Sequence, residues 1–437
     1  MKNLFKLKNK MYSSFFLSGI IFIIIAIISH YIDVFISTTG YSDVFVVDNA
    51  FVQSIIIMSI GVIVTILTIT FSSILVVLTL YSAQFSPRTL GDFLQRKVPV
   101  KVLAYLSGSI IFLLINAILI EQGQVENYPV SFLLIMLVVL IGIGIFVYYI
   151  QYVSKAIQIS SYMEQLVQEA VTQIKTYSEA LESDPMISSS KEGVGSFENA
   201  VEQKSFQTGY FTGINIVPLM EFLTEKDIRI IITVSLNDYV YEDDIIFEYT
   251  TKKSKYEFTD EDLKKFLNFS DAADNEHELF NKSKKLIDIG IRALSPGTND
   301  PKTAIDCINH LSFILMKLAN NFSAMNYQDE NGIIRVNLQN KPFDVILYEH
   351  FYQLHMYGHK DLFVYSSIIQ ALSRIAKSSS ALIKRSTWKF YDYLAKDFDL
   401  NSLHRYDYKL INDEIKELAY CCDKMSAYKE SMQKSAK

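Results

Sequence analysis

The sequence is poor in the residues that mark disordered, fibrous or disulfide-bonded proteins. Its 437 residues include only 3 Cys, 8 Pro and 16 Gly, whereas half of the residues are hydrophobic. This composition excludes a disordered chain, a collagen-like repeat and a disulfide-rich miniprotein. Cys307, Cys421 and Cys422 lack paired spacing, which argues against a disulfide framework.

Positive charge is also scarce. The chain has 41 Lys and Arg against 47 Asp and Glu, a formal net charge of −6. We therefore expect no nucleic acid partner. The mean hydropathy of +0.19 is high for a soluble protein of this size.

Four long apolar stretches account for that hydropathy. Each has about 20 residues or more, enough to cross a hydrocarbon core of roughly 30 Å. The second is long enough that it must tilt or project beyond the bilayer. Cleavage of the first as a signal peptide is disfavoured, because its apolar region is too long and Ser37–Gly40 is a poor cleavage site. The sequence thus predicts a transmembrane domain over 1–155, with spans at about 15–36, 51–80, 100–120 and 130–150.

The basic residues near the ends of the spans predict the orientation. They occur before the first span and between the second and third, at Lys2, Lys6, Lys8, Lys10, Arg88, Arg96, Lys97 and Lys101. The other two loops carry acidic residues only. Since basic loops stay on the cytoplasmic side, we expect both termini to be cytoplasmic.

A few polar residues lie inside the predicted spans. Thr65, Thr68 and Ser72 in the second span, and Asn116 in the third, are candidates to line a pore. The alternative is that the hydroxyls bond back to their own helix or hold neighbouring helices together. We expect His30 and Asp33 to lie at the membrane interface. No span carries a buried Lys, Arg or Glu, so no ion-coupled transport site is visible.

An amphipathic helix is predicted to continue the fourth span. Over 156–183 its apolar residues recur in steps of three and four, as in the seam of a coiled coil. Either it is a stalk that self-associates in an oligomer, or its apolar face packs on its own domain.

The remainder of the chain predicts an α+β, mainly helical cytoplasmic domain. A linker at 184–200 is followed by a small β-rich module, so that 184–260 forms one segment. A helical domain follows over 261–437, interrupted by a hairpin at 327–341 with Asn331-Gly332 as its turn. Its predicted helices span 260–269, 276–293, 301–321, 343–357, 361–378, 383–397 and 405–432.

Two short motifs are candidate ligand or partner sites. The first, with Gln84, Ser86 and Arg88, follows the second span, where Pro87 breaks the helix and places Arg88 at headgroup depth. The second is a corner between two helices, with Ser295, Gly297, Asn299 and Asp300 as candidates. Asp300 is placed as an N-cap ahead of Pro301, and the alternative is a purely structural corner.

These motifs resemble those of a bacterial family of predicted membrane proteins, known as domain of unknown function 2254. Its Q-x-S-P-R-x-L-x-x-F segment is matched from Gln84 to Phe93, and its A-L-S-P-G-x-N-D-P-x-T-A segment from Ala293 to Ala304. The chain departs from the family at Gln95 and at Asn237–Asp243, which suggests a divergent member. The resemblance implies a four-span bacterial inner-membrane protein with a cytoplasmic tail, and it supplies no activity.

Metal and catalytic sites are less well supported. His355 and His359 lie one helical turn apart, with His350 nearby, but Gly358 interrupts the pattern. We expect solvated or packed histidines, no metal and no cofactor. No catalytic acid–base or nucleophile set is visible, so an enzyme is disfavoured.

The sequence favours two functional hypotheses. One is a non-enzymatic pore or transport-type homo-oligomer with a cytoplasmic regulatory domain. The other is a membrane-anchored regulatory or scaffold protein that binds a ligand or partner through its cytoplasmic domain. A membrane enzyme that acts on a lipid or envelope precursor is a third hypothesis.

Overall fold

The computed structural model places the described residues in two compact units, Met1–Tyr162 and Met163–Lys437. It describes residues 2–39, 48–80, 97–123, 125, 127–183, 186–190, 200–251, 256–271, 280–320, 322, 324–338, 341–377, 379–398 and 400–435.

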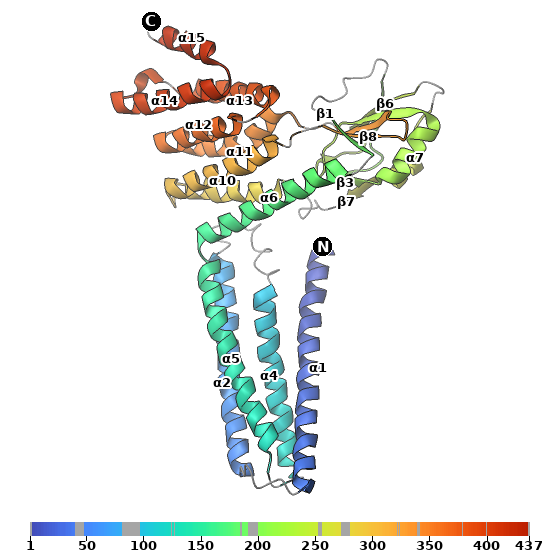
Figure 1. Ribbon diagram of the computed structural model, residues 1–437, viewed down its shortest axis with the longest axis vertical. Helices are drawn as coiled ribbons and strands as arrows, with labels where there is room; N and C mark the ends of the chain where they lie inside the picture. The colour runs from blue at the N-terminus through green and yellow to red at the C-terminus, as the bar shows by residue number, and fades with distance from the viewer. Residues whose placement is uncertain are drawn as a thin grey trace. The chain divides into compact units, whose positions relative to one another are not determined.

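The first unit is a bundle of four long apolar helices (Figure 1). They are α1 (Lys2–Thr39), α2 (Asn49–Leu80), α4 (Lys97–Glu121) and α5 (Pro129–Ala156). Each contains a stretch long and apolar enough to cross a membrane, which confirms the four predicted spans. The second is the longest of these stretches, at 32 residues.

Close helix contacts hold this bundle together. A Cβ at Gly108 of α4 would lie 2.4 Å from the Phe22 ring of α1, so only glycine allows this approach. Ser18 donates a hydrogen bond to the carbonyl of Ala104 at 2.7 Å. The Tyr105 hydroxyl donates to the carbonyl of Val138 on α5 at 3.0 Å. Small residues and interhelical hydrogen bonds thus supply the packing that hydrophobicity cannot supply inside a bilayer.

The amphipathic helix after the fourth span is a separate helix, which corrects the prediction that it continues that span. α5 ends at Ala156 and α6 (Ile159–Ser183) begins after a break at Ile157-Gln158. The apolar face of α6 is buried in its own unit, where Met163 contacts Cys307 and Glu169 pairs with Lys282. The helix therefore packs on its own domain.

The second unit contains two sheets. The larger has the strand order β1-β8-β9-β4-β6-β2 and the smaller β5-β3-β7. The strands are β1 (Ile187–Ser190), β2 (Val201–Lys204), β3 (Gly209–Ile214), β4 (Ile228–Ile232), β5 (Tyr239–Val240), β6 (Ile245–Thr251), β7 (Leu267–Ser270), β8 (Ala324–Gln328) and β9 (Ile334–Leu338). Helices α7 (Ile216–Lys226) and α8 (Asp260–Phe266) pack against these strands. Their shared core includes Phe211, Leu223, Ile230 and Phe247.

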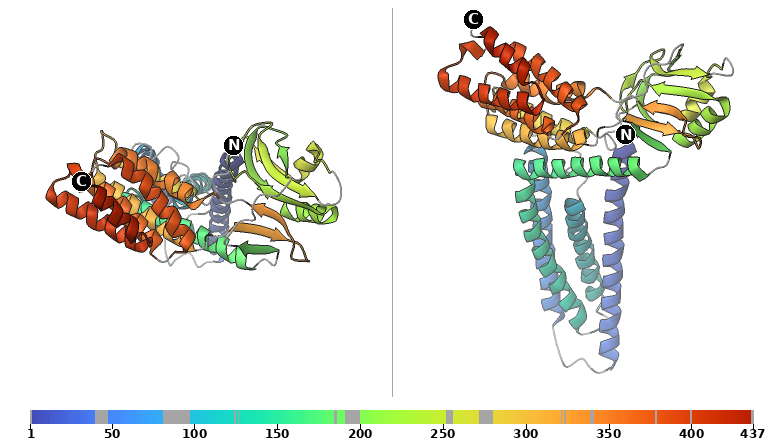
Figure 2. Two further views of the ribbon diagram at one scale, coloured as in Figure 1. Left: turned by 90° about the horizontal axis from the view of Figure 1, so that it is seen from above. Right: turned by 45° about the horizontal axis from the view of Figure 1, so that its top comes forward.

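Three features of these sheets differ from the prediction. Residues 267–270, of which 267–269 were expected to end a helix, form β7 and pair with β3. Residues 187–190, expected in a linker, form β1 and pair with β8. The predicted hairpin exists as β8 and β9, but it belongs to the sheet of the β module, because β9 pairs in parallel with β4. Figure 2 shows the orange strands of this hairpin among the green strands of the module.

The remaining helices form the helical part of the second unit. They are α9 (Asn281–Ala293), α10 (Pro301–Asn320), α11 (Phe343–Gly358), α12 (Leu362–Ala376), α13 (Ala381–Leu394), α14 (Arg405–Cys421) and α15 (Met425–Ser435), with short 3-10 turns η4 (Ala395–Asp397) and η5 (Leu400–Ser402). The last predicted helix is in fact two, because Asp423 adopts a left-handed backbone with φ 59° between α14 and α15. The overall class, four apolar helices followed by a mainly helical region with strands, is as predicted.

Candidate functional sites

The second span presents two opposite faces. Val52, Ile56, Ile63, Thr70 and Val77 are buried in the bundle. The opposite face carries small and polar side chains at seven-residue spacing in two series, and these side chains are exposed in the single chain: Ser54, Gly61 and Thr68, and Thr65, Ser72 and Thr79. The expected pore-lining residues of α2 therefore lie on the side that faces away from their own bundle.

Four hydroxyls of this face, those of Ser54, Thr65, Thr68 and Thr79, are bonded within their own helix. Thr65 donates to the carbonyl of Gly61 at 2.7 Å, and Thr68 to that of Val64 at 2.9 Å. A Cβ placed at Gly61 would meet nothing within 4 Å. The hydroxyl oxygens keep their acceptor lone pairs for water or for another polar group.

Asn116 differs from these residues because it is fully buried in the bundle. Its amide nitrogen donates to the carbonyl of Phe112 at 2.9 Å. Its Oδ1 has no hydrogen-bond partner among the described residues. Asn116 thus does not share a surface with Thr65, Thr68 and Ser72.

A carboxylate inside the bundle was not expected. Asp33 of α1 is fully buried, and its two oxygens accept the main-chain N–H groups of Val130 (2.8 Å) and Ser131 (2.9 Å). These groups begin α5, after Pro129, so the carboxylate of one span caps the N-terminus of another. His30, one turn earlier, is also buried and stacks on Tyr128. Both side chains are thus buried among the helices, where α5 supplies Asp33 with hydrogen-bond donors. Their depth at the membrane interface stays a prediction.

The corner between α9 and α10 is built as the sequence predicts. Asp300 caps α10, with its Oδ1 accepting the N–H of Thr303 at 3.2 Å and its Oδ2 accepting the Thr303 hydroxyl at 2.6 Å. These bonds from Thr303 lower the pKa of Asp300 and keep it ionised. The Ser295 hydroxyl donates to the carbonyl of Arg292 at 2.7 Å.

The tip of the corner is exposed and less constrained. Asn299 has φ 46°, a left-handed conformation that Asn tolerates, and its side chain is exposed. A Cβ at the exposed Gly297 would meet nothing within 4 Å. The fold therefore uses Ser295 and Asp300 but places no steric demand on Gly297. Gln84, Ser86 and Arg88 lie outside the described residues.

The three neighbouring histidines have different surroundings. His350 is buried, with Nδ1 2.7 Å from the carbonyl of Ile346 and Nε2 2.8 Å from the Ser283 hydroxyl. Burial lowers its pKa to about 4, so the ring is neutral. His355 is buried beside Asp397, and His359 is partly exposed. Among the described residues, no group of three or more His, Cys, Asp or Glu side chains is arranged to hold a metal ion.

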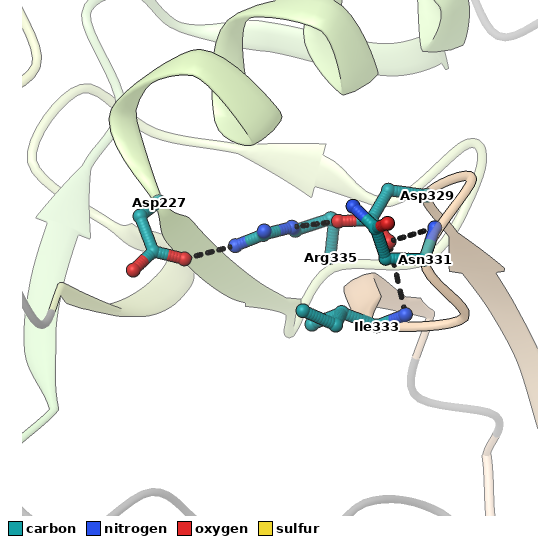
Figure 3. A network of polar contacts seen from close by, with 5 residues as sticks. All are labelled: Asp227, Asp329, Asn331, Ile333 and Arg335. Atoms are coloured by element: carbon teal, nitrogen blue, oxygen red, sulfur yellow. Dashed lines mark hydrogen bonds and ion pairs between the residues drawn. The ribbon is translucent and has the colours of Figure 1, made fainter.

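A buried network of charges holds the large sheet to its neighbouring helix (Figure 3). Arg335 of β9 is 4% exposed and bonds through Nε to Asp329 and through Nη1 to Asp227, both at 2.8 Å. Burial alone would raise the pKa of Asp329, but bonds from Ile333, Arg335 and Asn331 outweigh it and lower that pKa. Asp227 ends α7 with φ 55°, so the network joins α7 to the β8–β9 hairpin.

Sequence reasoning named Asp33 without its partner and missed Arg335. The signal for Asp33 was an acidic residue inside an apolar run, a type of residue that is seldom left without a partner there. Arg335 lies in the short strand Ile334–Leu338 between apolar residues, where alternation gives no warning of a buried cation.

Known proteins match the chain over very different lengths. The model of the family described as "Predicted membrane protein (DUF2254)" matches residues 8–374. Uncharacterized proteins of Mycobacterium bovis (Mb1321c) and Mycobacterium tuberculosis (Rv1290c) are each 32% identical over 96 residues, covering 22% of this chain and 18% of the relative. The chain thus spans less than a fifth of the length of these relatives. No solved structure matches it.

Proposed function

Because the chain belongs to the family of predicted membrane proteins of unknown function 2254, we propose a function from its own geometry: a non-enzymatic pore or transport-type homo-oligomer. In this proposal copies of the chain meet around α2 in the bacterial inner membrane. Both termini are cytoplasmic, and the second unit regulates conduction from that side.

The two-faced character of α2 carries this proposal. One face packs inside the bundle, whereas the opposite side carries a narrow stripe of small and polar residues flanked by exposed apolar side chains such as Met58 and Leu75. The stripe consists of Ser54, Gly61, Thr65, Thr68, Ser72 and Thr79. Small residues let helices of neighbouring copies approach closely, and hydroxyl groups can line a hydrated path.

Ion flux through the purified full-length protein in liposomes tests the proposal. We expect Thr65→Leu, Thr68→Leu and Ser72→Leu to reduce flux, because each fills the path with an apolar side chain. Val64→Leu is the matched control, since Val64 is exposed on the same helix but lies beside this face. Unchanged flux in all three variants, or no flux from correctly inserted protein, would refute a pore along α2.

Cross-linking tests the assembly separately. Thr68→Cys should form a disulfide between copies in native membranes, because the proposal places these faces together. Phe71→Cys, exposed on the flank of the same helix, should form it much less readily. The natural cysteines Cys307, Cys421 and Cys422 are buried and do not compete.

The corner between α9 and α10 supports a second candidate function, a scaffold that binds a ligand or partner. The observation in its favour is the exposed tip with Gly297 and Asn299, where the fold places no steric demand on Gly297. Pull-down with Asn299→Ala should lose a partner that the unaltered chain retains. An identical set of partners for the two proteins would remove the corner from consideration.

A further inference from the structure

One end of the helical part of the second unit gathers several helix termini. The contacts of Gly358 and His355 show this. A Cβ at Gly358 would lie 3.1 Å from Leu294, so the ends of α9 and α11 meet. His355 near the end of α11 pairs with Asp397 just after α13, at 3.3 Å. We call this end of the bundle the corner end.

The start of α14 lies at the corner end as well. Lys384 near the start of α13 pairs with Asp423 after the end of α14, at 2.8 Å, so these two helices are antiparallel. Gln370 of α12 bonds to Glu414 of α14 at 2.8 Å. Because the end of α12 leads into the start of α13, α12 and α14 run parallel. Leu362 and Tyr406, each eight residues before this contact, therefore lie at the same height along the two helices. The opposite end of the bundle leads into the sheet, because α10 runs on to β8.

Large aromatic side chains project from the corner end. Tyr357 is 58% exposed, Phe363 68% and Tyr406 86%. They come from the ends of three different helices, α11, α12 and α14. Exposed aromatics on a shared end of a domain mark a contact surface.

Basic and acidic side chains both lie around these aromatics. Lys360 and Arg405 are exposed beside Phe363 and Tyr406. Three described acids here have hydrogen-bond or ion-pair partners: Asp361 accepts the N–H groups of Phe363 and Val364, Asp397 faces His355, and Asp300 caps α10. Asp407 also lies here and is partly buried. Aromatic rings at headgroup depth, with long basic side chains that reach the phosphates, are the usual means of interfacial contact.

We propose that the corner end inserts Phe363, Tyr406 and Tyr357 into the headgroup layer of the bilayer that holds the four spans. We assign a lipid surface as the partner of the corner end because the second unit is tethered to the membrane. Only Ile157-Gln158 separate the end of the fourth span from α6. The tether holds the unit near lipid at a high effective concentration, so a few aromatic side chains are enough. This inference rests on the membrane location and is independent of a pore.

A single tryptophan probe tests this in full-length protein reconstituted into phosphatidylcholine vesicles. Trp388, the only tryptophan, is replaced by Phe, and Phe363→Trp or Tyr406→Trp is added. We expect acyl-brominated lipid to quench both probes and their emission to be blue-shifted. Tyr420→Trp is the matched control: Tyr420 is 75% exposed on the same helix α14, about 21 Å from Tyr406 at 1.5 Å per residue. Its emission should be unchanged.

Several outcomes would overturn the proposal. These are no quenching at Phe363→Trp and Tyr406→Trp, or equal quenching of Tyr420→Trp. Cysteine labelling repeats the test without altering Trp388. An impermeant maleimide should modify Phe363→Cys more slowly than Tyr420→Cys in vesicles, and equally fast in detergent. Protection in native membranes but not in pure lipid would assign the corner end to a protein partner instead.

Discussion

Asp33 and Ser131 join the first membrane helix to the last. The carboxylate of Asp33 accepts the main-chain N–H of Ser131 at 2.9 Å, and both side chains are fully buried. A helix N-terminus carries a partial positive charge, so this contact places a carboxylate in an apolar bundle without a basic side chain. This single contact fixes the register of two helices whose bonded residues are almost 100 positions apart in sequence.

The Asp33 contact predicts a selective loss of stability. Asp33→Leu should destabilise the bundle by about 1 to 2 kcal/mol, because two N–H groups at the start of α5 lose their acceptors. The measurement is thermal unfolding of the full-length protein in detergent. Ser131→Ala is the control: the N–H remains and the hydroxyl has no hydrogen-bond partner among the described residues, so stability should hardly change. Equal losses in the two variants would contradict the capping role.

The charge network of Arg335 predicts a larger effect. Arg335→Met should lower the free energy of unfolding by about 3 kcal/mol, because Asp329 is left buried without its cation. The comparison is Lys204→Ala, which removes an exposed pair with Asp243 and should change stability by less than about 1 kcal/mol. Chemical denaturation measures both. The double variant Arg335→Met with Asp329→Asn should lose less than the sum of its parts, and simple additivity would count against the network.

Two glycines provide a matched pair. Gly290→Ala should destabilise the protein by about 1 to 3 kcal/mol, because its Cβ would lie 2.7 Å from Leu354 and 3.3 Å from Cys307. Gly297→Ala should be neutral for stability, because its Cβ would meet nothing within 4 Å. Melting temperatures of the two variants check this. If Gly297→Ala is stable yet loses a partner in pull-down, the corner has a role beyond the fold.

His350 predicts a pH dependence of stability. Its pKa falls from 6.5 to about 4 on burial, so the unfolded chain binds the proton more tightly than the folded one. The stability it contributes is complete above pH 6.5 and is lost as the pH falls toward 4, by on the order of 2 to 3 kcal/mol. His350→Gln should flatten this part of the profile of unfolding free energy against pH. An unchanged slope between pH 6.5 and 4 would show that His350 is not the group responsible.

Local patterns were enough to predict most of the helices and strands, because apolar periodicity and turn residues determine them. The four spans and the Asp300 cap are examples. Partners distant in sequence were not predictable: nothing local in Asp33 specifies the start of α5, and nothing in Ile187–Ser190 specifies β8. The break at Ile157-Gln158 carries neither Pro nor Gly, and it reflects the packing of α6 on its own domain. The candidate corner was predicted as a structure, because Asp300 ahead of Pro301 is a local capping signal.

The position of the β8–β9 hairpin has a consequence for synthesis of the chain. Ile230 of β4 pairs with Val336 of β9, 106 positions later. Until the ribosome has released β9, one edge of β4 stays unpaired, and such edges invite wrong partners. If the chain is divided anywhere between β4 and β9, neither fragment contains all the strands of the large sheet. The sheet and the helices around the hairpin must therefore mature together, late in translation, while the four apolar helices are already available for insertion into the membrane.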